Sequence, residues 1–492
     1  MASRKTASPA SIHPIDRPHQ RFHDSAQPRV HENEIAQSYR FGSTLTQLSD
    51  LSRRDRVETV TSALTLPSGN QPIVDGRRSA DPAQVLAHEG LPGADPLTGQ
   101  LDRWLASRGA ELVAVRRHLH AHPELSGREF ETSALVAREL TAAGLAPRFL
   151  PKGNGIICDI PGEDNSHTVA LRADLDALPL QDVKNVPYRS TVDGVCHACG
   201  HDVHTTILLG TGMALAQLAA RGELPGRVRL LFQPSEEVMQ GGAPEVIAAG
   251  GLRNVSSIFA LHCAPQIPAG LVGVRSGPIT AATDLVEVRL TGRGGHTARP
   301  HLTTDLVHAL GRVIVDVPAL LDRRVDPRAG VSMVFGAVRG GEAANAIPSE
   351  GMVRGTVRVL SRDAYREMPR LITQLIRDVV AGTGAEVDIE YRRGVPPVIN
   401  DRVATAVVAG AAAAALGPDR VIEAEVSMGG EDYAFYLEQV PGAMIRLGTG
   451  APGASDQLDI HQANFDVDER AIGYGVRVFV HTALAALSSA TF

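Results

Sequence analysis

The sequence is poor in cysteine, in excess positive charge and in long apolar runs, and each shortage excludes a class of protein. Four cysteines among 492 residues are too few for a disulfide framework, which favours a reducing compartment. A formal net charge of -7 indicates no basic surface for nucleic acid. No apolar run reaches the roughly 18 residues of a membrane span, and no apolar signal-peptide region follows the basic first residues. We therefore expect a cytoplasmic protein that binds neither nucleic acid nor a membrane.

Two motifs that would indicate other chemistry are also missing. The sequence has no G-x-S-x-G motif, which argues against a serine hydrolase with a nucleophile elbow. A closed structural zinc site needs four protein ligands, usually from paired short spacings, and no second Cys-x-x-Cys pair follows the one at 196–199. Instead, single carboxylates and imidazoles follow several apolar strands, which favours a catalytic site built from strand ends.

The length of 492 residues suggests about two or three domains. Residues 1–96 lack sustained periodicity and are rich in Pro, Ser, His, Arg and Asp, so we expect a disordered extension. A functional tail and an over-extended gene start are the alternatives. Residues 97–277 alternate short apolar strands with helical stretches, and 394–492 continue that pattern. This alternation predicts an α/β domain with a mainly parallel sheet.

A different pattern occupies residues 278–393. Its elements follow the order β-α-β-β-α-β, and its strands alternate apolar and polar residues, as expected for an antiparallel sheet with one solvated face. The sequence therefore predicts a ferredoxin-like α+β domain that is inserted into the α/β domain.

The highest density of metal-binding side chains lies at 196–204, where two thiols and three imidazoles fall within nine residues. Thiolate and neutral imidazole are ligands that divalent transition metals prefer, and Cys199 and His201 can reach one metal together. A structural zinc knot or a reduced cysteine loop is the alternative. Three further histidines, at 118, 120 and 122, follow a predicted helix and are interpreted as helix-end residues, since a spacing of two cannot converge on one helix face.

Other candidate ligands and bases follow apolar strands, at the edge where open α/β sheets place their sites. They are Asp174 and Asp176 after 168–171, Glu236 and Glu237 after 227–232, His262 after 257–261, and His461 beyond 444–448. A helix-capping aspartate and a solvated pair of surface glutamates are the alternatives at the first two places.

In combination, these motifs resemble a metal-dependent amidohydrolase family that includes hippurate hydrolases, aminoacylases and indole-acetyl-amino-acid hydrolases. The members of this family are dinuclear metallopeptidase relatives of carboxypeptidase G. The resemblance covers roughly 101–487. Its motifs are RADLDALP at 172–179, ACGHDVH at 198–204, FQPSEE at 232–237, LH at 261–262, GRGGHTARP at 292–300, NAIP at 345–348, GGEDY at 429–433 and DIHQANFDVDE at 459–469. Gly430 and Val203 depart from the serine and glycine that many members have there, and neither departure removes a proposed ligand.

The resemblance implies a fold and a set of residue roles. The fold is a mainly parallel-sheet dinuclear metallopeptidase catalytic domain with an inserted ferredoxin-like dimerisation domain. The implied metal ligands are Cys199, His201, Glu237, His262 and His461. Glu236 is implied as the general base and Asp176 as the carboxylate that orients a ligand. Asp174 is either a second orienting carboxylate or a spare ligand.

The implied reaction is hydrolysis of the amide bond of a small N-acyl amino acid by a metal-activated water. We expect two divalent metal ions per subunit, manganese or zinc, with cobalt or nickel as alternatives. The enzymatic alternative is a dipeptidase, or a deacetylase acting on a biosynthetic N-acetyl amino acid. A metal-binding protein without catalysis would predict the loss of Glu236 or of a ligand, and none is missing.

The resemblance also implies roles for residues of the inserted domain. His296, in a glycine-rich turn, would stabilise the tetrahedral oxyanion from the partner subunit of a homodimer formed through the inserted domains. A turn histidine is the alternative. Asn345 resembles a residue that helps to hold the substrate there. Arg393, directly before a Gly-Val-Pro-Pro run, is a candidate for binding a substrate carboxylate.

Overall fold

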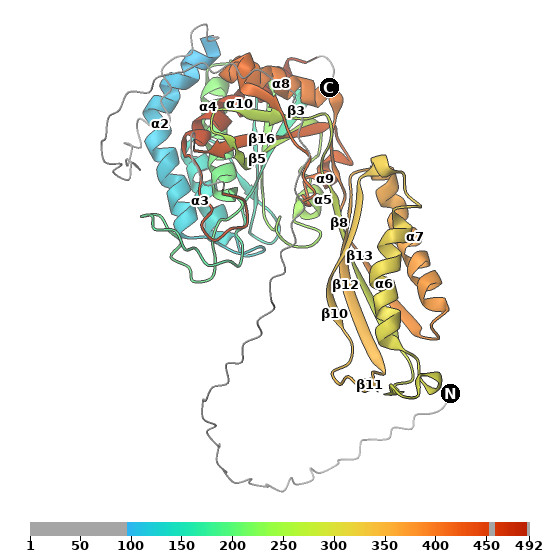
Figure 1. Cartoon of the computed structure of the whole chain (residues 1–492). Helices are drawn as coiled ribbons and strands as arrows, with labels where there is room; N and C mark the ends of the chain where they lie inside the picture. Colours follow the sequence, from blue (N-terminus) through green and yellow to red (C-terminus); the bar gives the residue numbers. More distant parts are fainter. Residues whose placement is uncertain (1–95, 452–457, 490–492) are drawn as a thin grey trace, which may run out of the picture. The chain divides into compact units, whose positions relative to one another are not determined.

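The structure of the protein is a computed structural model, which describes residues 96–451 and 458–489 (Figure 1). The expected disordered extension, 1–96, lies outside the described residues except for its last residue. The described chain contains a large mixed sheet with helices on both faces and a second, four-stranded sheet formed by a segment inserted between two strands of the first.

The larger sheet has eight strands in the order β1-β2-β4-β3-β5-β16-β6-β15. Its strands are β1 (Arg148–Phe149), β2 (Ile156–Ile160), β3 (Asp164–Asp174), β4 (Gly226–Gln233), β5 (Val255–Pro268), β6 (Val272–Val274), β15 (Val421–Glu423) and β16 (Gly442–Gly450). The central strands β4, β3, β5 and β16 are parallel, whereas β1 and β2 on one side and β6 on the other join antiparallel. Since β16 follows the inserted segment and β5 precedes it, the two halves of the α/β domain share one sheet.

Helices cover both faces of this sheet. One face packs against α2 (Pro96–Ala121), α3 (Phe130–Ala142), α4 (His201–Ala220), α8 (Arg402–Leu416) and α10 (Arg470–Leu487), and the other against α5 (Ala243–Ala248) and α9 (Ala434–Leu437). The strands alternate accordingly, since Ile445 and Leu447 of β16 enter the first core and Met444 enters the second. By length and composition α4 could cross a membrane, but most of it is buried inside the first core.

The register of the four parallel strands places a row of polar residues near their carboxyl ends. Asp174 of β3 is the partner of Gln233 of β4, and His262 of β5 is the partner of Arg446 of β16. Arg172 is paired with Ala260, so Asp174, two residues later, is level with His262. Residues that are level in a sheet project from the same face. The row Gln233–Asp174–His262–Arg446 therefore lines one face of the sheet at its carboxyl edge.

The inserted segment forms an antiparallel sheet in the order β10-β12-β8-β13. Its strands are β8 (Ala282–Thr291), β10 (Val331–Arg339), β12 (Glu350–Val359) and β13 (Glu386–Val395). Two helices, α6 (Leu306–Leu321) and α7 (Arg362–Ala381), pack on one face (Figure 1). Each helix begins after a capping side chain, Asp305 for α6 and Ser361 for α7, which accepts a hydrogen bond from a backbone amide of the first turn.

Two short strand pairs complete the inserted segment. β9 (Gly295–His296) pairs with β11 (Ala346–Ile347), and β7 (Gly277–Thr280) pairs with β14 (Val398–Asn400) where the chain enters and leaves. The fold class predicted from the sequence is thereby confirmed, including the order β-α-β-β-α-β. The domain bounds at 278 and 393 stay a prediction. The sequence analysis did not identify several elements, which are β1, β2, β6, β7, β9, β11, β14, β15, α5, α9 and α10.

Candidate metal centre

Two adjacent glutamates, Glu236 and Glu237, lie in the turn that follows β4. The turn begins at Ser235, whose φ of 62° is a left-handed conformation that non-glycine residues rarely adopt. The buried carboxylate of Glu129 holds this turn in place. Oε1 of Glu129 accepts hydrogen bonds from the backbone amides of Ser235 and Gly127, each at 2.8 Å. Strained backbone persists where its surroundings determine it, and it concentrates at functional sites.

His201, at the start of α4, is oriented by Asp176. Its Nδ1 is 2.9 Å from the backbone oxygen of Asp176 and 3.3 Å from the Oδ1 of the same residue, so Nδ1 carries the proton and donates it. The other nitrogen, Nε2, is then an acceptor and lies 3.8 Å from Oε1 of Glu237. Oδ2 of Asp176 accepts hydrogen bonds from the Glu237 amide (2.9 Å) and the Ser126 hydroxyl (2.6 Å). One buried carboxylate therefore positions two of the candidate ligands.

His461 meets the same glutamate from the far end of the chain. Its Nε2 lies 3.4 Å from Oε1 of Glu237, and its backbone amide donates to the Ala198 carbonyl at 2.7 Å. His461 has a φ of 61°, so its backbone is left-handed, like that of Ser235. The nearby carboxylate of Glu237 raises the pKa of His461, and burial opposes that effect.

Cys199 and His262 complete the group of predicted ligands. The thiol Sγ of Cys199 lies 3.5 Å from Nε2 of His262, whose Nδ1 donates to the Cys263 carbonyl at 2.8 Å. The donor atoms of Cys199, His201 and His262 lie within 4.8 Å of one another, and so do those of Cys199, Glu237 and His461. The structure therefore brings together all five residues that the sequence suggested as ligands.

These residues suit divalent metal ions by an observation that is independent of any resemblance. Among the described residues, Nε2 of His201 and Oε1 of Glu237 are buried and have no hydrogen-bond partner. Buried polar atoms without partners cost free energy, so native proteins rarely leave them unsatisfied. Imidazole, thiolate and carboxylate at mutual distances of this order are a donor set that zinc and its neighbours in the first transition row accept.

Asp174 is held by two partners and also forms a candidate metal group with His201 and His204, so both of its predicted roles stay open. Its Oδ1 is 2.7 Å from Nδ1 of His204, and its Oδ2 is 2.6 Å from Nη1 of Arg172. His204 in turn accepts a hydrogen bond at Nε2 from the Cys263 amide at 2.8 Å. Asp174 thus ties the end of β3 to the start of α4 and, through His204, to β5.

Glu236 lies among carboxylates rather than among cations. Its carboxylate is grouped with those of Glu431 and Asp432, and with His201 and Glu237 on the other side. Burial raises the pKa of Glu236 well above its ordinary value, and the neighbouring charges of Glu431, Glu237 and Asp432 add to that effect. A carboxyl group in such surroundings takes up a proton more readily than one in water, as a general base requires.

Three further candidates, His296, Asn345 and Arg393, were predicted in the inserted domain. His296 and Asn345 are both exposed. They lie close together, because the amide of Thr297 donates a hydrogen bond to the Asn345 carbonyl at 3.2 Å. Within the described residues, neither side chain makes an ion pair or a hydrogen bond with the five candidate ligands. Arg393 stacks 3.7 Å over the ring of Tyr365 and lies 3.4 Å from Oδ2 of Asp284. Its proposed role toward a substrate carboxylate stays a prediction.

The sequence analysis missed a buried arginine that organises the centre. Arg172 of β3 contacts Asp174, Glu431 at 3.0 Å and Asp432 at 2.7 Å, which joins β3 to the segment before α9. A second buried arginine, Arg116, bonds Asp202 at 2.9 Å, next to His201. The sequence contained one indication of the role of Arg172. It was the acidic pair of the motif GGEDY at 429–433, to which the sequence analysis gave no role.

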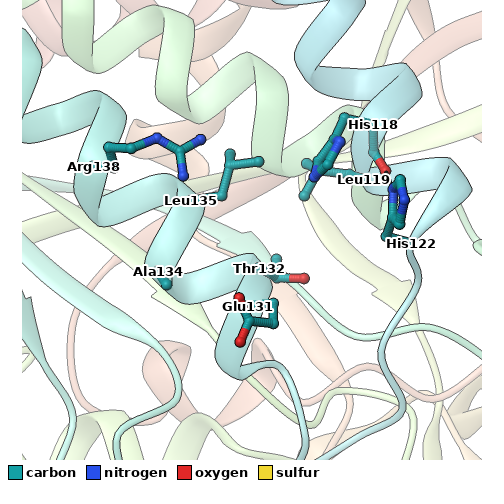
Figure 2. Close-up of a pocket in the computed structure, with 8 residues that line it drawn as sticks. All are labelled: His118, Leu119, His122, Glu131, Thr132, Ala134, Leu135 and Arg138. Atoms are coloured by element: carbon teal, nitrogen blue, oxygen red, sulfur yellow. Dashed lines mark hydrogen bonds between the residues drawn. The ribbon is translucent and has the colours of Figure 1, made fainter.

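The three histidines at the end of α2 divide into two kinds. His120 is buried and bonds Asp202 and Asp182. His118 and His122 are exposed and line a surface pocket between α2 and α3, with their ring centroids 4.4 Å apart (Figure 2). A spacing of four residues brings these two rings together, which the sequence analysis did not consider. Neither ring belongs to a described group of three or more metal donors.

Comparisons with known proteins agree with this geometry. The model of peptidase family M20/M25/M40 matches residues 170–485. A Bacillus subtilis protein named N-acetylcysteine deacetylase is 36% identical over 379 residues, which cover 77% of this chain and 97% of that protein. A solved structure from Bacillus subtilis, described as a dinuclear metal binding peptidase from the M20 family, is 35% identical with a TM-score of 0.68 and covers 77% of this chain and 98% of its own.

A further relative is longer than this chain. A Rhodococcus jostii protein named putative glutamate–cysteine ligase 2-3 is 46% identical over 370 residues, which cover 75% of this chain. They cover 46% of that protein, so the chain spans about half the length of this relative. The ligase in that name therefore describes a longer protein.

Proposed function

This chain belongs to peptidase family M20/M25/M40, and on that basis we propose that it hydrolyses the amide bond of N-acyl amino acids at a centre of two divalent metal ions. The observation that supports this most directly is the convergence of five donor side chains on the carboxyl edge of the sheet, with His201 Nε2 and Glu237 Oε1 buried and unpartnered among the described residues. The name of the deacetylase relative indicates the same class of amide substrate.

Two donor sets can hold the two ions. Cys199, His201 and His262 form one set, and Cys199, Glu237 and His461 form the other. Cys199 belongs to both sets. Manganese or zinc suits this mixture of sulfur, nitrogen and oxygen donors, with cobalt or nickel as alternatives. When bound, a pair of such ions polarises the amide carbonyl and makes water a nucleophile at neutral pH.

Glu236 would manage the proton in this reaction. Its carboxylate lies in one group with His201 and Glu237, so it borders the metal ligands. Because burial and nearby carboxylates raise the pKa of Glu236, it can accept a proton from the attacking water and return it to the departing amine. Glu236→Gln should therefore keep its metal and lose about 10²–10⁴-fold in turnover number.

The test is a hydrolysis panel of acetyl-, benzoyl- and indole-acetyl-amino acids together with dipeptides. The protein is first stripped with a chelator and then reconstituted with one metal at a time. We expect hydrolysis of N-acyl amino acids that disappears on chelation and returns with metal. Preferential cleavage of dipeptides would favour the dipeptidase alternative, and strict preference for acetyl groups would favour a deacetylase. Activity that survives complete metal removal would refute the proposal.

We further propose that the enzyme works as a homodimer through its inserted domain. β10 is an edge strand of the inserted sheet and exposes Val334 and Val338 at 59% and 56% of their surface. Exposed apolar edge strands invite pairing, and a two-fold pairing of β10 with its copy would cover them. His296 and Asn345 would then serve the partner's centre, where His296 would donate to the oxyanion. Such a donor contributes about 10²–10³-fold to the rate.

Subunit mixing tests the action of His296 across the dimer. The inactive variants His296→Ala and Glu236→Gln are combined under conditions that exchange subunits. If His296 acts on the partner's centre, the heterodimer contains one intact centre and part of the activity returns. His301→Ala, which changes another exposed histidine of the same loop, is the control and should stay active. A mixture that stays inactive despite proven subunit exchange would exclude the arrangement.

A further inference from the structure

The row of polar residues at the carboxyl edge of the sheet ends in a residue with no role so far. Asp174 and His262 of the row belong to the centre or to its supports, and Gln233 is hydrogen-bonded to Arg172 and Asp432. Arg446 is the fourth member, level with His262 on the neighbouring parallel strand. Adjacent strands lie about 4.8 Å apart, and level residues project from the same face, so the Arg446 side chain starts one strand spacing from a proposed metal ligand.

Arg446 differs from Arg172 and Arg116 in that no carboxylate of the described residues forms an ion pair with it. Within 96–451 and 458–489, its guanidinium forms no ion pair and no hydrogen bond, although it is partly buried. Arg172 already engages three carboxylates, including Glu431, which is also the nearest acidic influence on Arg446. Burial lowers the pKa of Arg446, and the charges of Glu431 and Cys199 oppose that effect.

None of the Arg446 nitrogens is among the buried atoms that lack a hydrogen-bond partner, so the guanidinium is accessible to a ligand. The planar fork of arginine matches a carboxylate in a bidentate manner, which makes a carboxylate the preferred ligand. In an N-acyl amino acid, the free carboxylate is three bonds from the carbonyl carbon under attack, about 3–4 Å away. A carboxylate so close to the carbonyl carbon is within the reach of a long side chain on the strand next to His262.

We propose that Arg446 binds the free carboxylate of the amino-acid half of the substrate and thereby fixes the amide over the metal centre. This inference rests on the proposed function and names the group that selects the substrate. It also gives the carboxylate a receptor on the α/β domain, whereas Arg393 is engaged by Tyr365 and Asp284 within the inserted domain.

The experiment compares a substrate with its uncharged analogue. The N-acyl amino acid that the metal-loaded wild type cleaves fastest is paired with its primary amide, which lacks the negative charge. Arg446→Met should lower kcat/KM for the acid about 10–100-fold, the value of one hydrogen-bonded charge, and leave the amide nearly unchanged. Arg446→Lys keeps the charge without the fork and should lie in between. Equal losses on acid and amide would overturn the proposal, because they would indicate a structural role.

The matched control is Arg227→Met. Arg227 is also a partly buried strand arginine of the same sheet without an ion pair among the described residues, but it lies at the amino-terminal end of β4. Its replacement should leave the ratio of acid to amide hydrolysis unchanged. A change in that ratio as large as the one from Arg446→Met would also count against the assignment.

A binding measurement separates this inference from the proposed function. N-benzoylglycine and N-benzoylglycinamide are titrated calorimetrically into the metal-loaded Glu236→Gln variant, with and without Arg446→Met. We expect Arg446→Met to weaken binding of the acid about 10–100-fold and to leave the amide unaffected. A wild type that cleaves none of the panel, together with this binding difference, would refute the function and keep the carboxylate site. Cleavage without the binding difference would refute the site and keep the function.

Discussion

Replacement of Asp176 by asparagine tests whether the centre depends on its supporting carboxylate. The change keeps the size of the side chain and removes its charge. Asp176 is 1% exposed, and its Oδ2 accepts hydrogen bonds from Ser126 and from the Glu237 amide. Its Oδ1 faces Nδ1 of His201 at 3.3 Å, where the amide of asparagine would offer either a weaker acceptor or a competing donor.

The size of the effect follows from these contacts. Hydrogen bonds to a charged group contribute about 1.5–3 kcal/mol, against about 0.5–1.5 kcal/mol for neutral partners. Loss of the charge therefore removes about 1–3 kcal/mol of the free energy that holds His201 and Glu237 in their orientations. Independent experience with residues that support metal ligands gives losses of about 10–100-fold in metal affinity, which is the same range. Ser126→Ala removes one of the two bonds to Oδ2 and should cost about tenfold or less.

The assay is competition for Zn²⁺ between the stripped protein and a chromophoric chelator. Melting curves of the metal-free proteins establish that each variant is folded. Asp159→Asn is the control, because Asp159 pairs with Arg229 at 2.6 Å at the other end of the sheet and should change stability without changing metal affinity. An Asp176→Asn protein that binds zinc as tightly as the wild type would refute the reasoning, since no other described residue orients both His201 and Glu237.

Three other expectations follow from the same contacts. Glu237→Gln should lose metal in the chelator competition, whereas Glu236→Gln should retain it, and identical behaviour would show that the two roles are wrongly divided. Cys199→Ser should weaken metal binding about 10–100-fold or more, whereas Cys196→Ser, in a small apolar cluster with Phe465, should do much less; equal losses would indicate a structural site. Burial alone would raise the pKa of Asp182, but hydrogen bonds from His120, Ser190 and Lys184 outweigh it and lower that pKa below its usual range. The stabilisation is therefore full above the unfolded pKa of about 3.9 and is lost as pH falls below it, so the difference in unfolding free energy between wild type and Asp182→Asn should shrink below about pH 4 and stay constant above pH 5.

Strand ends were the part of the centre that could be predicted from sequence. β3 and β4 end at Asp174 and Gln233, and a polar residue at the end of an apolar run marks the edge of a parallel sheet. β5 differs from the expectation, because it continues past His262 to Pro268 and His262 lies inside it. The inserted domain could also be predicted from the sequence. Its strands alternate apolar and polar residues, which distinguishes them from the continuous apolar strands of the main sheet.

The rest could not be derived because it depends on contacts between distant segments. Strands as short as β6 and β15 exist only through their pairing with neighbours and carry no periodic signal of their own. α10 is buried along most of its length, so it lacks the polar stripe that reveals a surface helix. The ion pair of Arg172 with Asp432 joins residues 260 positions apart, and no local pattern specifies that meeting. Arg446 escaped notice because only the register shows that it is level with His262.

The donors of the centre lie on both sides of the inserted domain, and this orders events during synthesis. A ribosome releases Cys199, His201, Glu237 and His262 first, then the whole inserted domain, and only afterwards β16 and His461. A nascent or truncated chain that ends before β16 lacks both the central strand beside β5 and the last ligand. If the proposed residues hold the metal, tight binding would require a finished chain, and the stabilisation by a bound ion would distinguish complete molecules from fragments.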